Sequence, residues 1–283
     1  MPHYRDHADD MAANRLNWDE RVRIHVASDF YNVAAFRAGA TTLLPVEVEE
    51  VGEVLGKTLL HLQCHFGLDT LSWAQVGALV TGVDFSGAAI TTAQTLAQEL
   101  KIDARFIESN VYDLREALTG TFDVVFASYG VLVWLPDLPE WGRIVASFVR
   151  PGGFLYIIDG HPFFHMFADS PSGKDLRLVN RYFTSEALSY EEDGTYADPN
   201  AKLEHKRQYE FQHTLGEIVT SLVDAGLQIE FLHEFPFSAY AALPDMEKGD
   251  DGYYRLRQHD GLVPFLFSLK ARKQPARAAP AAE

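Results

Sequence analysis

Asp84 is the first residue whose type and position indicate ligand binding. It ends an apolar run in the segment Val83-Asp84-Phe85-Ser86. A carboxylate at the end of a parallel strand can accept hydrogen bonds from both hydroxyls of a ribose, and Phe85 offers an apolar face to an adenine ring. The alternative is an acid that caps the following helix, although Ser86 could fill that role itself. Together with the loop that precedes it, the segment favours a nucleoside-binding site.

That preceding loop is Gln63-Cys64-His65-Phe66-Gly67, which follows another apolar run. A pyrophosphate cofactor would require G-x-G-x-x-G, because the backbone must approach two phosphates at a helix N-terminus. Gln63 and His65 stand where glycines would be needed, and only Gly67 remains. The loop therefore argues against NAD or FAD and for a nucleoside without phosphates, although by itself it could be a plain turn between a strand and a helix.

Two further segments carry polar side chains after apolar runs. Asn110, before Val111, has an amide that can both donate to and accept from the amino edge of adenine, and an ordinary turn asparagine is the alternative. Ser128 and Tyr129 follow a later run and would face the other end of the ligand. Trp134 would also lie there, unless it is a core residue.

An alternation of short apolar runs and helical segments must position these residues. Strands are expected at 57–62, 78–83, 104–107, 122–127 and 154–158, with helices at 68–76, 88–100, 112–118 and 138–149 between them. Strands separated by helices of this length indicate βαβ units and a parallel sheet with right-handed crossovers. A final helix at 215–225 and strands at 227–231 and 262–270 complete the pattern.

The chain divides into four parts on the same evidence. Residues 1–55 form an N-terminal lid segment, of which 1–20 are polar and resemble a frayed lead-in. Residues 56–270 form the α/β domain, and 160–213, which lack the βαβ rhythm, are an insertion in it. The Ala/Pro/Arg-rich tail at 271–283 is expected to be disordered.

Composition excludes several classes of protein. The 283 residues hold 24 Lys and Arg against 40 Asp and Glu, a formal net charge of −16, which makes nucleic acid a poor candidate partner. The single cysteine, Cys64, excludes an internal disulfide and a multi-cysteine zinc site. No apolar run is long enough to span a membrane. A cytoplasmic protein with a small-molecule substrate is expected, and a homodimer is compatible with the sequence.

The order and content of these segments resemble class I S-adenosylmethionine-dependent methyltransferases. The segments that match are Leu60–Gly67, Gly82–Ser86, Ser109–Val111, Phe122–Gly130 and Phe148–Gly153. The last is similar to the family's L-x-P-G-G, with Val149 in place of the leucine. The first, within LHLQCHFGLDTL, resembles a bacterial subgroup of these enzymes. His61 replaces the family's usual acid there, and Gln63 and His65 replace two glycines, so a side chain could bind the carboxylate of the ligand.

The resemblance implies a Rossmann-like, doubly wound α/β sheet of seven strands, mostly parallel with an antiparallel last strand. It also implies methyl transfer from S-adenosylmethionine to a small-molecule acceptor by in-line displacement, leaving S-adenosylhomocysteine. A protein or tRNA methyltransferase and a non-catalytic S-adenosylmethionine sensor are the alternatives. The expected cofactor-binding residues are Tyr31, Gln63, His65, Gly67, Asp84, Phe85, Ser86, Asn110, Val111, Ser128 and Tyr129.

Two histidines are candidate general bases, because histidine titrates near neutral pH. His161 follows the fifth strand, where a substrate pocket should open, and His25 lies in the lid segment. His161 and His165 could bind a metal only if they shared a helix, and no third ligand is evident, so no metal is expected. The aromatic residues of the lid segment and the insertion are expected to close over the sulfonium; they are Trp18, Phe30, Tyr31, Phe163, Phe164 and Phe167.

Overall fold

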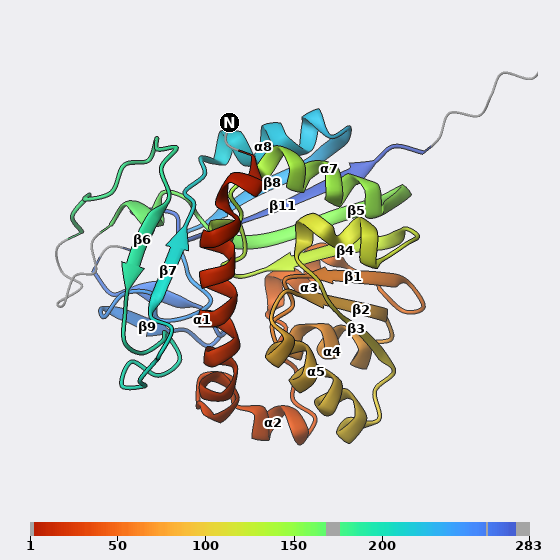
Figure 1. The fold of residues 1–283 in the computed structure, drawn as a ribbon, viewed down its shortest axis with the longest axis horizontal. Helices are drawn as coiled ribbons and strands as arrows, with labels where there is room; N and C mark the ends of the chain where they lie inside the picture. The colour runs from red at the N-terminus through yellow and green to blue at the C-terminus, as the bar shows by residue number, and fades with distance from the viewer. Residues whose placement is uncertain (1–2, 168–175, 259, 276–283) are drawn as a thin grey trace, which may run out of the picture.

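Seven strands form the main sheet of the protein, whose computed structural model describes residues 3–167, 176–258 and 260–275 (Figure 1). Their order across the sheet is β3-β2-β1-β4-β5-β11-β8. The first five in this order run parallel to one another, and β11 is antiparallel to both β5 and β8. The predicted seven-stranded sheet with an antiparallel last strand is confirmed. The strands are β1 (Thr58–Leu62), β2 (Leu79–Asp84), β3 (Ala104–Glu108), β4 (Phe122–Ser128), β5 (Val149–Gly160), β8 (Leu227–Phe235) and β11 (Leu266–Lys273).

Helices cover both faces of this sheet. Side chains alternate along each strand: Leu60 and Val125 pack with α7 and α8, whereas Leu59 and Val124 pack on the opposite face with residues of α3 and α4. Both faces are buried, which explains the near-continuous apolar strands. The helices are α1 (Ala8–Ala27), α2 (Val33–Arg37), α3 (Pro45–Val51), α4 (Leu68–Gln75), α5 (Gly87–Leu100), α6 (Leu114–Ala117), α7 (Leu138–Phe148) and α8 (Leu215–Asp224).

The N-terminal region differs from the prediction. Residues 1–20 were expected to be a frayed lead-in, but most of them belong to α1, a helix of 20 residues. Its buried face is mainly polar, with Asn14, Asn17, Arg21 and His25 beside a single valine, so a search for apolar periodicity does not detect it. Within the described ranges, α1 included, no helix combines the length and apolar character needed to cross a membrane.

The insertion contains a β-hairpin that lies against α1. Strand β6 (Leu188–Glu191) pairs antiparallel with β7 (Arg207–Glu210), and Figure 1 shows α1 between this hairpin and the main sheet. A second small sheet, β9 (Met246–Lys248) with β10 (Tyr254–Leu256), precedes β11.

The expected start of the disordered tail was wrong. Residues 271–273 belong to β11, because they continue its pairing with β5 and β8, where Ala271 is opposite Leu155 and Ile229. Residues 276–283 of that predicted tail lie outside the described part of the chain.

Candidate functional site

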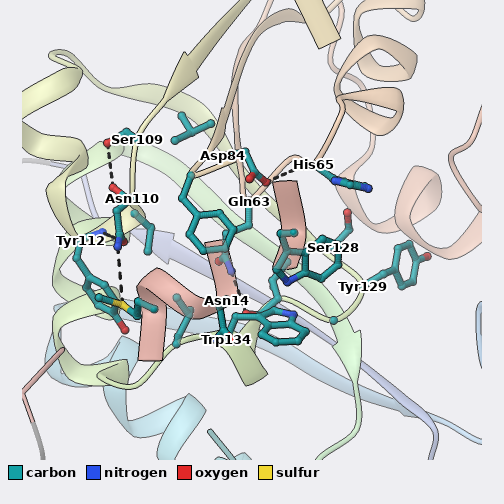
Figure 2. Close-up of a pocket in the computed structure, with 18 of the residues that line it drawn as sticks. Asn14, Gln63, His65, Asp84, Ser109, Asn110, Tyr112, Ser128, Tyr129 and Trp134 are labelled. Atoms are coloured by element: carbon teal, nitrogen blue, oxygen red, sulfur yellow. Dashed lines mark hydrogen bonds between the residues drawn. The ribbon is translucent and has the colours of Figure 1, made fainter. Parts of the chain in front are cut away.

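A cavity opens at the carboxyl ends of the parallel strands. In an open α/β sheet this edge is where ligands bind, next to the point at which the strand order reverses, here between β1 and β4. The cavity is lined by Met11, Asn14, Trp18, Tyr31, Gln63, His65, Val83, Asp84, Phe85, Ser109, Asn110, Val111, Tyr112, Ser128, Tyr129, Gly130, Val131, Trp134, Leu135 and Tyr196. Figure 2 shows Gln63 near its centre, between Asp84 and Trp134.

In the loop after β1, two residues other than glycine adopt a backbone conformation that favours glycine. Gln63 has φ 54° and His65 has φ 51°, both in the left-handed region, and Gly67 has φ 80°. A non-glycine residue in this region costs about 1–3 kcal/mol and persists where its surroundings enforce it. The side-chain amide of Gln63 donates to the carbonyl of Val131 at 3.0 Å, while its Oε1 is buried with no partner among the residues that the structure describes. The loop therefore brings the side chains of Gln63 and His65 into the cavity wall while its backbone keeps conformations that favour glycine.

Asp84 is held in position by the backbone around it. Its Oδ2 accepts from the N–H of His65 at 2.8 Å (Figure 2). Its Oδ1 accepts from the N–H of Ser86 at 2.9 Å. Burial raises the pKa of Asp84 to about 6, partly opposed by these two hydrogen bonds. Because this buried carboxylate has lone pairs to spare, it can accept from ligand hydroxyls.

The end of the cavity beyond β3 is suited to a flat ring. Asn110 caps the following turn, since its Oδ1 accepts from the N–H of Tyr112 at 3.1 Å, and its Nδ2 lies 3.8 Å from the sulfur of Met11. Phe85 and Val111 also line the cavity. Apolar faces beside one amide edge are what an adenine requires.

The opposite end is bordered by residues that follow β4. Ser128 donates through Oγ to Asp69 Oδ2 at 3.0 Å, and the hydroxyl of Tyr129 contacts the buried carboxylate of Glu47. Tyr129 has a left-handed φ of 54°. Burial raises the pKa of Glu47 well above its usual range, and the nearby Asp69 raises it further. Neither carboxylate lines the cavity, so both act on the site through Ser128 and Tyr129.

Helix α1 covers the cavity, and polar contacts hold it there. Met11, Asn14 and Trp18 line the cavity from this helix, and the indole of Trp18 meets that of Trp134 edge-on at 5.4 Å. Asn14, which is 1% exposed, donates to the carbonyl and accepts from the N–H of Tyr209 in β7, both at 2.8 Å. On the other side, Asp19 accepts from the hydroxyl of Ser86 at 2.6 Å.

Most of the predicted cofactor-binding residues line this one cavity: Tyr31, Gln63, His65, Asp84, Phe85, Asn110, Val111, Ser128 and Tyr129. Gly67 and Ser86 do not line it. Gly67 begins α4, and a Cβ there would lie 2.7 Å from the ring of Phe106, so close packing requires the glycine. Ser86 is fully buried and caps α5 by accepting from the N–H of Ala89.

Neither candidate base lines the cavity. The Nε2 of His161 lies 2.8 Å from Glu234 Oε1, and its Nδ1 accepts from the N–H of Phe163. His25 lies behind the cavity wall, with its Nδ1 2.9 Å from His65 Nε2. Burial lowers the pKa of His25 to about 3 and lowers that of His161, opposed in His161 by Glu234.

Of the expected aromatic lid, Trp18 and Tyr31 line the cavity, whereas Phe30, Phe163, Phe164 and Phe167 do not. The main residues that sequence reasoning missed are Met11, Asn14, Tyr112 and Tyr196. The α1 residues were detectable, because Met11, Asn14, Trp18, Arg21 and His25 recur every three or four positions, as one helical face requires. Tyr196 sits in the irregular insertion, where no local pattern marks it.

Comparison with known proteins identifies the class of fold. The family described as "Methyltransferase domain" matches residues 59–153, which hold β1 to β4 and the start of β5. A solved S-adenosylmethionine-dependent methyltransferase from Mesorhizobium loti covers 84% of this chain and all of its own, with a TM-score of 0.56 and 20% identity. One from Methanosarcina mazei covers 83% of this chain and 99% of its own, with a TM-score of 0.53 and 19% identity. Residues 59–153 therefore match the methyltransferase-domain family, and the chain has the fold of these solved S-adenosylmethionine-dependent methyltransferases.

Curated relatives match a shorter part of the chain. A ubiquinone biosynthesis O-methyltransferase of Pseudomonas paraeruginosa is 31% identical over 136 residues, 47% of this chain and 58% of the relative. One from Albidiferax ferrireducens is 34% identical over 136 residues, 48% of this chain and 51% of the relative. The chain thus spans between half and three fifths of the length of these relatives.

Proposed function

We propose that the protein transfers a methyl group from S-adenosylmethionine to a small-molecule acceptor. The observation that carries the proposal is the cavity at the carboxyl ends of the parallel strands, with the buried carboxylate of Asp84 in its wall. The class I fold and the matched methyltransferase domain support the choice of cofactor.

The residues present fit this cofactor. Asp84 would accept from the ribose hydroxyls, and Phe85 and Val111 would pack against the adenine, whose amino edge Asn110 would bind. The Oε1 of Gln63, buried and without a partner, faces the region of the sulfur-bearing chain and can accept a hydrogen bond there. S-adenosylmethionine, when bound, supplies an electrophilic methyl group on a sulfonium.

Positioning and exclusion of water are the main contributions of the protein to the reaction. An in-line displacement needs an acceptor opposite the sulfur, and holding both reactants accounts for much of the acceleration. Trp18, Trp134 and Tyr196 give the cavity an aromatic wall that excludes water. The predicted base roles of His161 and His25 are not part of this proposal, because neither lines the cavity.

Calorimetric titration tests the cofactor assignment. We expect S-adenosylmethionine and S-adenosylhomocysteine to bind and NADH not to bind. Asp84→Asn should weaken S-adenosylhomocysteine about 10-fold to 100-fold, since a hydrogen bond to a charged group contributes about 1.5–3 kcal/mol. Failure of the wild-type protein to bind either compound would overturn the proposal.

Turnover then separates an enzyme from a sensor. Because the relatives are named O-methyltransferases, hydroxyl-bearing small molecules are the first acceptors to screen, with methyl-labelled S-adenosylmethionine. Cofactor binding without label transfer to any small molecule would favour the sensor.

A further inference from the structure

One corner of the cavity wall contains a buried arginine that forms no ion pair with any described residue. Arg21, on the α1 face that carries Asn14 and Trp18, is only 5% exposed. Its Nη2 donates to the neutral amide oxygen of Gln208 at 2.8 Å, its guanidinium lies 5.1 Å from the ring centroid of Trp18, and its Nε has no hydrogen-bond partner among the described residues. No described carboxylate is within ion-pair distance of it; burial lowers the pKa of Arg21, and the charges of Glu192 and Glu210 oppose this only from farther away. A buried cation is costly unless it is paired, so this arginine suggests an anion that arrives with a ligand.

A second orphaned atom lies one helical turn away. His25 is fully buried, and its Nε2 has no hydrogen-bond partner in the described part of the chain. Arg21 and His25 interact electrostatically, since the charge of the arginine lowers the pKa of the histidine. Residues four apart on a helix lie on the same face. The Nε of Arg21 and the Nε2 of His25 therefore belong to one corner of the molecule.

Residues of the cavity wall cover this corner. The ring of His25 packs on those of Tyr31, His65 and Tyr196, with centroids 5.2, 5.1 and 4.8 Å away. These three residues line the cavity, whereas Arg21 and His25 lie behind them. The hydroxyls of Tyr31 and Tyr196 contact each other, and Tyr196 is 45% exposed, so it can swing outward.

The donor and acceptor nitrogens of His25 and His65 can be assigned. Burial lowers the pKa values of His25 and His65, so both rings are neutral near pH 7 and each carries one N–H. If His25 Nε2 donates to an anion, His25 Nδ1 must accept from His65 Nε2. His65 Nδ1 then keeps a lone pair that can accept from an ammonium group. The corner thus offers donors to an anion and an acceptor to a neighbouring cation.

We propose that Arg21 and His25 bind the carboxylate, and His65 the ammonium group, of the amino-acid end of the cofactor, once Tyr31 and Tyr196 part. The inference rests on the proposed function and deepens it. It also accounts for His65 in the loop after β1. His65 stands in place of a glycine of the family that the sequence resembles, and its side chain would contact the amino-acid end of the cofactor.

Three ligands that differ at that end test the subsite by calorimetry. They are S-adenosylhomocysteine, its decarboxylated form, which lacks only the carboxylate, and 5′-methylthioadenosine, which lacks the whole amino-acid end. The wild-type protein should prefer S-adenosylhomocysteine over the decarboxylated form by at least about tenfold, as expected for charge-assisted hydrogen bonds. Arg21→Met should reduce this preference to less than about threefold, while the affinity for 5′-methylthioadenosine changes by less than about twofold.

Matched variants distinguish carboxylate binding by Arg21 from a purely structural role of Arg21 in α1. Arg15→Met removes an exposed arginine of the same helix and should keep the preference, and Arg21→Lys should restore part of it. His25→Phe, which keeps a ring and removes both nitrogens, should give a smaller loss than Arg21→Met. Equal weakening of all three ligands in Arg21→Met would show that Arg21 only holds α1 on the hairpin, and would overturn the proposal.

The remaining outcomes are also decisive. A wild-type protein that does not distinguish S-adenosylhomocysteine from its decarboxylated form overturns the subsite even if Arg21→Met fails to fold. Benzoate and benzyl alcohol, titrated into protein saturated with S-adenosylhomocysteine, test whether the anion comes from the acceptor. Loss of benzoate binding alone in Arg21→Met would overturn the assignment to the cofactor. If the wild-type protein binds none of the three nucleosides, the proposed function itself fails.

Discussion

The main sheet and the α1 lid are held in place by different kinds of contact. Strands β1 and β4 contribute fully buried aliphatic and aromatic side chains to clusters on both faces of the sheet. The buried face of α1 is mostly polar, and Asn14, Asn17 and Arg21 each form side-chain hydrogen bonds to the hairpin of the insertion. Burial of apolar area stabilises any well-packed arrangement, whereas hydrogen bonds require one geometry. The sheet therefore holds most of the buried apolar side chains, and polar contacts give the lid a defined docking position.

The largest effect should come from truncating the sheet's core. Leu60→Ala removes a side chain that is 0% exposed, and such changes lower the free energy of unfolding by about 2–5 kcal/mol. Urea denaturation followed by circular dichroism measures it. The control is Leu55→Ala, since Leu55 is 72% exposed. A loss below about 1 kcal/mol would contradict the division between core and lid.

A smaller and local effect is expected in the lid. Asn14→Ala removes two buried hydrogen bonds to the backbone of Tyr209, which should cost about 2 kcal/mol. Hydrogen exchange should show faster exchange in α1 and β7 with unchanged protection in β1 and β4. Gln98→Ala, which removes an exposed amide of α5, should change neither. Loss of protection in β1 would mean that lid and sheet unfold as one unit.

The smallest effect is a pH dependence of ligand binding. Ribose hydroxyls donate to the ionised form of Asp84, whose pKa burial raises to about 6. The affinity for S-adenosylhomocysteine should therefore rise with pH through this value and fall below it, by at most about tenfold per pH unit. Calorimetry between pH 5 and 8 measures the slope, and Asp84→Asn should flatten it. An affinity that falls with rising pH would exclude this role for Asp84.

The sheet and most of its ligand-facing residues were predictable because their signals are local. Apolar runs of strand length separated by helical segments define the parallel core, and topology then places the ends of its strands at one edge. Asp84 and Asn110 could be named for this reason. The left-handed backbone conformation of His65 could not be predicted, because it depends on surrounding residues that the loop sequence does not reveal.

Contacts between distant segments were not predictable. Strand β8 was expected to stop at residue 231 but extends to Phe235. Its extra residues bring Glu234 to His161, so His161 is hydrogen-bonded to Glu234 and does not line the cavity. The docking of α1 on the hairpin could not be predicted, because the partners of its buried polar side chains, such as Gln208 and Tyr209, lie almost 200 positions away in the sequence.

The side chains of α1 also complete the hydrogen bonding of a strand edge. A two-stranded hairpin has outer edges whose free N–H and C=O groups can pair with a strand from another molecule and seed aggregation. Asn14 occupies both groups of Tyr209, and Asn17 donates to the carbonyl of His205 at 2.6 Å. A helix that lifts away from the cavity would thus expose this edge. The same two asparagines therefore both hold α1 over the cavity and shield this edge from pairing with another molecule.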